Sequence, residues 1–168
     1  MISWAFYPKS DKPTPLAVKV VEQFGAVEAA ITSANHMLDS DAVLAHVSPG
    51  LTELGFRVEV SKKSADKVRV PVLLGRQGRD EKSFDADAYH ETAGFVVEVE
   101  AGRAVTNYQF LKDLFEACMM HEVAYLAIAV RQTYRGRNNF EVVCTFFDTL
   151  FASARLKLPL SGVLIIGY

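Results

Sequence analysis

The fold is decided by residues 84–100, which read FDADAYHETAGFVVEVE. Apolar and polar residues alternate on both sides of the turn-like segment 91–94, so two antiparallel strands joined by a short turn are predicted. With the turn placed there, Asp87 should face Glu98 and Asp85 should face Glu100. The four carboxylates then share one face of the hairpin. The opposite face is expected to lie in the core and carries Phe84, Ala86, Ala88, Phe95, Val97 and Val99.

Four carboxylates on one strand face need a positive partner. Like charges that oppose each other across a strand pair are destabilising, and at about 4 Å each pair repels by roughly 4 kcal/mol at an intermediate effective dielectric. Mg²⁺ is commonly held by one or two carboxylates together with substrate phosphates. The hairpin therefore predicts a Mg²⁺ site, with Mn²⁺ as a substitute. The alternative is a solvated acidic surface paired with lysines, and the candidates are Lys62, Lys63 and Lys82.

Length and composition indicate an ordinary globular chain. The 168 residues are 50% hydrophobic and 23% charged, which suits one domain, residues 1–168, that buries a core without disulfides. The formal charge of −2 argues against a protein that coats nucleic acid through bulk charge, but it allows a local basic groove. No apolar run reaches the length of a membrane span, so we expect a soluble, cytoplasmic protein that does not bind membranes.

The pattern around the hairpin predicts an α/β fold with a mixed sheet flanked by helices on both faces. A helical part, 14–54, should contain a long helix capped by Thr14 and started by Pro15, followed by two shorter pieces at 39–47 and 48–54. The core sheet and its helices should occupy 56–168. Strands are expected at 56–60, 68–74, 123–130 and 162–168, and helices after a Thr106-x-x-Gln109 capping box and over 140–156.

The acidic hairpin, the sequence Glu-Val-Glu at 98–100, the helix after it and the buried strand at 123–130 together resemble the PD-(D/E)XK nuclease superfamily. The resemblance covers 68–130 and is strongest to the branch that contains type II restriction endonucleases. It implies a restriction-endonuclease-like fold in which an aspartate of the second core strand and a glutamate of the third hold Mg²⁺ beside the scissile phosphate. Carried over, Asp87 or Asp85 takes the first role and Glu98 the second. We favour Asp87, because it should face Glu98.

Two departures from the family pattern bear on the site. No proline precedes either aspartate, and Glu100 stands where the family commonly has a lysine. The resemblance implies that an acid there can help to hold metal or activate water. Lys112, on the following helix, could reach back in place of the missing lysine. Arg103, just after the acidic strand, could bind a phosphate oxygen in a bidentate manner.

A basic, tyrosine-containing loop at 131–139 is a further candidate for binding substrate. Its residues Arg135 and Arg137 could follow a phosphate backbone, although a merely solvated loop fits the sequence as well.

Together these features predict a Mg²⁺-dependent endonuclease that hydrolyses DNA phosphodiester bonds. Its expected catalytic and metal-binding residues are Asp87, Glu98 and Glu100, assisted by Asp85. Two alternatives remain open: a catalytically inactive relative of the same fold that binds nucleic acid or protein, and an interaction module whose acidic face docks a basic partner. A homodimer or a partner protein is compatible with each of them.

Overall fold

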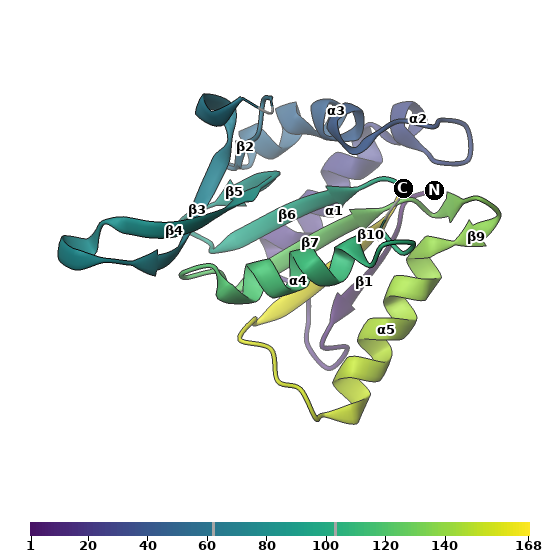
Figure 1. Ribbon diagram of the computed structural model, residues 1–168. Coiled ribbons are helices and arrows are strands. Elements are labelled where there is room, and N and C mark those ends of the chain that lie inside the picture. The colour runs from purple at the N-terminus through teal and green to yellow at the C-terminus, as the bar shows by residue number, and fades with distance from the viewer. Residues whose placement is uncertain (62, 103) are drawn as a thin grey trace.

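The computed structural model describes residues 1–61, 63–102 and 104–168, and only the backbone of Ser64. Its centre is a six-stranded sheet with the order β1-β10-β7-β6-β5-β2 (Figure 1). Strands β6, β7 and β10 run parallel, whereas β1, β5 and β2 are each antiparallel to their neighbours. The predicted mixed sheet is therefore confirmed. The strands are β1 (Ser3–Tyr7), β2 (Arg57–Val58), β5 (Ala88–His90), β6 (Phe95–Glu100), β7 (Tyr125–Val130) and β10 (Gly162–Gly167).

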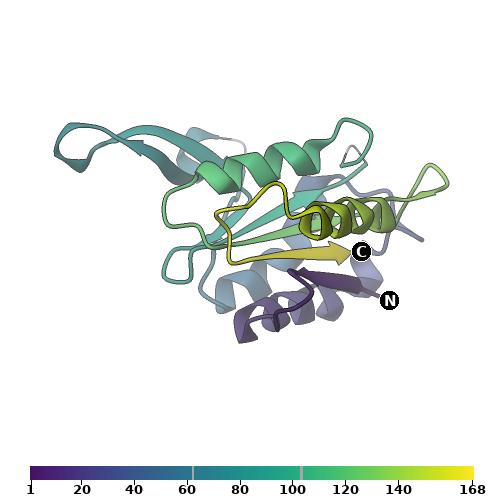
Figure 2. The same ribbon diagram turned by 90° about the horizontal axis from the view of Figure 1, so that it is seen from below.

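Helices cover both faces of this sheet, as predicted (Figures 1 and 2). One face carries α1 (Pro15–Ala26), α2 (Glu28–Ile31) and α3 (Ser40–Glu53), and the other carries α4 (Gln109–Met119) and α5 (Asn139–Ser153). Along β6, Val97 packs in the core beneath α1 and α3, while Val96 packs beneath α4 and α5. Because side chains alternate along a strand, Glu98 and Glu100 lie on the α4 side.

The N-terminal helices differ from the expectation in two places. Thr14 does cap α1, accepting a hydrogen bond from the Ala17 amide at 3.1 Å. The single long helix that was expected is divided, because α1 ends at Ala26 and α2 is a separate helix. The two pieces expected at 39–47 and 48–54 form the single helix α3, which continues through Pro49. A proline inside a helix forfeits one backbone hydrogen bond. The buried residues Val47 and Leu51, on either side of it, favour the continuous helix.

The register predicted for the hairpin at 84–100 is confirmed next to its turn at 91–94 and is wrong farther from the turn. Ala88 pairs with Val97 and His90 with Phe95, as the alternation predicts. Before Ala88, however, the chain leaves the central sheet. Strand β4 (Asp80–Ala86) pairs with β3 (Val68–Leu74) in a separate two-stranded sheet, here called the arm, which projects from the body (Figures 1 and 2). Asp85 consequently faces Arg69 in the arm and not Glu100.

The second half of the chain follows the prediction more closely. Strand β10 runs parallel to β7, and α5 precedes it. The capping box at Thr106 was wrong, because α4 begins at Gln109 after Tyr108, whose φ of 52° is left-handed and whose side chain makes no cap. Within the expected loop at 131–139, β8 (Thr133–Tyr134) and β9 (Arg137–Asn138) form a short hairpin. α5 ends at Ser153, short of the predicted 156. Among the described residues, no helix has both the length and the apolar character needed to cross a membrane.

Candidate functional site

Acidic side chains gather where β6 passes beneath α4. Strand β6 supplies Glu98 and Glu100, the residue before β5 supplies Asp87, and α4 supplies Asp113. We call these four residues the acidic cluster. Only 5% of Asp113 is exposed, although it is an acid. An ionised carboxylate is rarely tolerated at such burial without a positive partner.

Burial and neighbouring negative charge raise the pH at which the Glu98 carboxyl ionises. The pKa of Glu98 is raised well above its usual range, first by burial and then by repulsion from Asp87 and Asp113. A cation near Glu98 would remove that repulsion.

Asp113 is the member of the cluster that the sequence did not indicate. Burial, followed by the neighbouring charge of Glu100, raises the pKa of Asp113 to about 8. Its Oδ2 atom is buried and no donor of the described chain reaches it. A hydrogen bond with the Glu100 carboxyl, which needs a proton on one of the two acids, also raises the pKa of Asp113. The signal that could have found Asp113 is its spacing, because it lies three residues after Phe110 and four before Ala117, both buried on the inner face of α4.

Asp87 is fixed at the point where the chain enters the central sheet. Its Oδ2 accepts a hydrogen bond from the Val99 amide at 2.8 Å, and its carbonyl accepts one from the Glu59 amide at 2.7 Å. These bonds tie Asp87 to β6 on one side and to the end of β2 on the other. The structure therefore brings Asp87 beside Glu98, as the hairpin pattern predicted.

Asp85 lies outside the acidic cluster. Its exposed carboxylate forms an ion pair with Lys67 and lies 4.0 Å from the Nε of Arg69. The solvated, salt-bridged alternative thus describes Asp85 correctly, with Lys67 and Arg69 as its partners. Of the lysines expected there, Lys62 lies outside the described residues. The prediction that Asp85 assists a metal site is not supported by this position.

Lys112, on α4, is a cation whose pKa is affected by the acidic cluster. Its Nζ lies 3.1 Å from Oε2 of Glu116, one helical turn away. Burial acts to lower the pKa of Lys112, but Glu116, Asp113 and Glu98 outweigh it and the pKa is raised. The side chain is still 59% exposed, so it offsets the buried carboxylates only in part.

The donor set of the acidic cluster suits a hard divalent ion, but it is not assembled into a complete metal site. Carboxylate oxygens are the preferred ligands of Mg²⁺, and no donor of the described chain reaches the buried Oδ2 of Asp113. Across 1–61, 63–102 and 104–168, however, no group of three or more His, Cys, Asp or Glu side chains is placed to hold a metal ion. The residues present fit a site that supplies two carboxylates and leaves the other positions to water and phosphate.

Two cavities lie beside the end of β6. One, of about 400 Å³, is lined by Glu100, Gly102, Arg131 and Tyr134 together with the start of α3. The other, of about 300 Å³, is lined in part by Arg135 and Arg137. Tyr134 lines both, and its ring packs so closely on Gly102 that a Cβ there would lie 2.4 Å from a ring carbon. The structure thus brings Arg135 and Arg137 near the strand that carries Glu100, whereas Arg103 lies outside the described residues.

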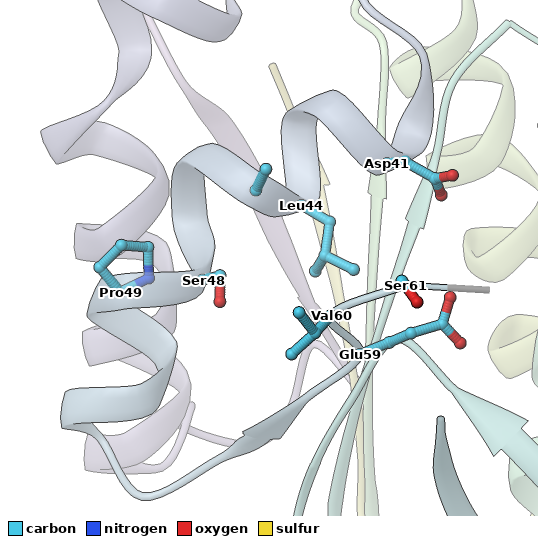
Figure 3. A pocket seen from close by; sticks show the side chains of 8 residues that line it. Asp41, Leu44, Ser48, Pro49, Glu59, Val60 and Ser61 are labelled. Atoms are coloured by element: carbon cyan, nitrogen blue, oxygen red, sulfur yellow. The ribbon is translucent and has the colours of Figure 1, made fainter. Parts of the chain in front are cut away.

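A third cavity, of about 260 Å³, opens between α3 and the segment that follows β2 (Figure 3). The carboxylates of Asp41 and Glu59 lie on the same side of it in this view, and Leu44, Val60 and Pro49 form much of the rest. The amide of Glu59 binds the Asp87 carbonyl, so one backbone hydrogen bond links a residue of this cavity to a residue of the acidic cluster. Sequence reasoning did not single out Glu59.

Comparison with protein-family models, with curated proteins and with solved structures found no match for this chain. The case for a function consequently rests on the geometry and electrostatics of the acidic cluster and on the cavities beside it.

Proposed function

We propose that this chain is a divalent-metal-dependent nuclease that cleaves DNA phosphodiester bonds. The observation that carries the proposal is the gathering of the partly buried Glu98 and the buried Asp113 beside Asp87, where burial and repulsion between the carboxylates raise the pKa values of Glu98 and Asp113. Clusters of acids with strongly perturbed pKa values are typical of functional sites. A purely structural use of the same positions would be better served by apolar residues.

The order of the elements supports the finer part of the proposal, a restriction-endonuclease-like core. The antiparallel strands β2, β5 and β6 are followed by α4 and by β7, which returns parallel to β6. Asp87 directly precedes the second of these strands, where the family resemblance implies an aspartate within the strand, and Glu98 lies in the third strand, as the resemblance implies. Glu100 remains the departure, and Lys112 of α4 supplies a cation near Glu98.

The residues of the chain have separable tasks in this proposal. A divalent ion, when bound, would supply a water of lowered pKa and offset charge on the phosphoryl oxygens. Glu98 and Asp87 would hold that ion, and Asp113 would complete the negative charge around it. Glu100, which lines the 400 Å³ cavity, could accept a proton from the attacking water. The ammonium of Lys112 would oppose charge on the phosphate.

The test is cleavage of supercoiled plasmid and of single-stranded, duplex and branched DNA with Mg²⁺, Mn²⁺ or EDTA. Glu98→Gln removes one ligand charge while keeping the side chain's shape, and we expect it to lower the cleavage rate at least ~100-fold. Asp85→Asn is the matched control, because it makes the same chemical change on the arm. We expect that control to cleave within about twofold of wild type.

Metal-dependent cleavage by the wild type and the control, lost in Glu98→Gln, would support the proposal. Equal cleavage by all three proteins would place the activity elsewhere or in a contaminant. If no substrate is cut with either ion while the folded protein binds DNA or a protein partner, the chain is an inactive relative or an interaction module.

A further inference from the structure

Apart from Val105, every described residue that lines the 300 Å³ cavity between the β8–β9 hairpin and the start of α5 carries a side-chain hydrogen-bond donor. The hairpin contributes Tyr134, Arg135 and Arg137, the segment after β6 contributes Thr106, and α5 contributes its first residue, Asn139. None of the described residues that line this cavity is acidic. Its lining differs in this respect from that of the cavity beside Glu100.

Asn139 is the residue that points to a ligand. Only 2% of it is exposed, and its Nδ2 is a buried donor with no hydrogen-bond partner anywhere in the described residues. Buried polar groups are nearly always satisfied, and leaving one unpaired costs free energy. The amide is not needed as a helix cap, because Oδ1 of Asn138 accepts the Glu141 amide at 3.1 Å. An acceptor oxygen in the cavity would give Nδ2 the partner it lacks.

The charge around Asn139 selects an anion as that acceptor. α5 has 15 residues, and its positive N-terminal end lies at the cavity. The guanidinium groups of Arg135 and Arg137 add two exposed cations on the hairpin, and such groups match the oxygens of a phosphate. The turn at Arg135 and Gly136 has φ values of 51° and 75°, as in a tight type I′ hairpin. The guanidinium of Arg135 lies over the ring of Tyr134, 5.2 Å from its centroid.

We propose that this cavity binds a phosphate group of a nucleic-acid strand, held by Asn139, Arg135 and Arg137 without a metal. Tyr134 separates the cavity from the one beside Glu100, so the bound phosphate would lie one side chain away from the proposed cleavage site. The inference rests on the proposed function for the identity of the strand. The phosphate has two sources, the terminal phosphate of a strand end and an internal phosphodiester.

The test is fluorescence anisotropy with a 3′-labelled 12-nucleotide DNA strand carrying either a 5′-phosphate or a 5′-hydroxyl, in EDTA and at fixed salt. Asn139→Asp replaces the amide donor with an acceptor of the same shape, and it should weaken binding at least ~10-fold. Arg155→Ala is the matched control, because it changes the net charge equally just beyond the other end of α5. We expect the control to bind within about twofold of wild type.

Arg137→Ala gives a second measurement on an exposed side chain, which keeps the test decisive if Asn139→Asp does not fold. It should weaken binding several-fold and lower the slope of log affinity against log salt by about one. A preference for the 5′-phosphate that Asn139→Asp abolishes identifies the terminal phosphate. Equal binding of both strands, weakened equally, identifies an internal one. If Asn139→Asp, or in its place Arg137→Ala, binds like Arg155→Ala, the inference is wrong. Because EDTA prevents metal-dependent cleavage, this outcome is independent of whether the chain is a nuclease.

Discussion

Asp85 and Asp87 are two residues apart in the sequence, yet they occupy unlike regions of the molecule. Asp85 lies on the arm, exposed and paired with Lys67 and Arg69. Asp87 lies at the edge of the central sheet, where its carboxylate accepts a hydrogen bond from the Val99 amide and lies beside the partly buried Glu98. On the arm, the carboxylate of Asp85 is solvated and forms an ion pair. Beneath α4, burial and neighbouring carboxylates disfavour the negative charge of an acid, and a proton or a cation would offset that charge.

The comparison shows that acidic spacing alone does not make a site. The same alternation of polar and apolar residues places an acid at 85 and at 87. The two positions differ in their surroundings, because α4 covers the acidic cluster, whereas Asp85 is exposed on the arm. Three experiments test this difference between the acidic cluster and the arm.

The largest effect is expected from Asp113→Asn. The pKa of Asp113 in the folded protein is about 8, raised from an ordinary 3.8, so between these values the folded state keeps a proton that the unfolded chain has lost. Stability therefore falls as the pH rises through this range. The asparagine side chain does not ionise in this range, so Asp113→Asn should stabilise the protein by roughly 3 kcal/mol more at pH 8 than at pH 5.

Urea unfolding at the two pH values measures this difference. Asp85→Asn, the control in the arm, should show no comparable dependence on pH. A gain for Asp113→Asn that is the same at pH 5 and pH 8 would contradict the raised pKa.

A smaller effect is expected on metal affinity. The carboxyl of Glu98 must release its proton before it can act as a ligand, and that of Asp113 must release its proton before it adds negative charge, so binding of Mn²⁺ should strengthen as the pH rises. We expect a gain of roughly tenfold between pH 6 and pH 7.5. Calorimetry in two buffers of different ionisation enthalpy would detect the released protons. Affinity that is independent of pH would place the ion away from the buried acids.

The smallest effect is expected in the arm itself. Asp85→Asn breaks an exposed ion pair and should change the free energy of unfolding by less than about 1 kcal/mol. In 1 M salt the difference should shrink further, because exposed charges are screened. Chemical denaturation with urea at low and high salt measures it. A loss of several kcal/mol would show that the arm's charges are as coupled as those beneath α4.

Much of the fold could be predicted because local patterns agree with it. The turn at 91–94 and the alternation beside it gave the register of β5 and β6. Continuous apolar runs gave β7 and β10, and helical spacing gave α5.

Other features could not be read from the chain. The crossing at Asp87 was missed because the alternation continues unbroken through both sheets, so one pattern satisfies two different pairings. Asp113 was missed because it stands next to Lys112, and such a pair suggests a solvated helix face. Asn139 was missed because a polar residue at the start of a helix suggests a cap.

The path of the chain around the arm has a consequence for engineering. The chain leaves the central sheet at Glu59 and returns at Asp87, and the hydrogen bond of 2.7 Å between them closes the excursion at its base. Pro71, whose carbonyl accepts the His121 amide at 2.7 Å, and Val72, which packs on the core, still belong to the body. The exposed tip of the arm, 73–82, can therefore be shortened, extended or replaced as a cassette. The pairing of β2 with β5 would persist beneath such a graft, and Asp87 would keep its position beside Glu98. The arm is where a new recognition element could be installed without rebuilding the acidic cluster.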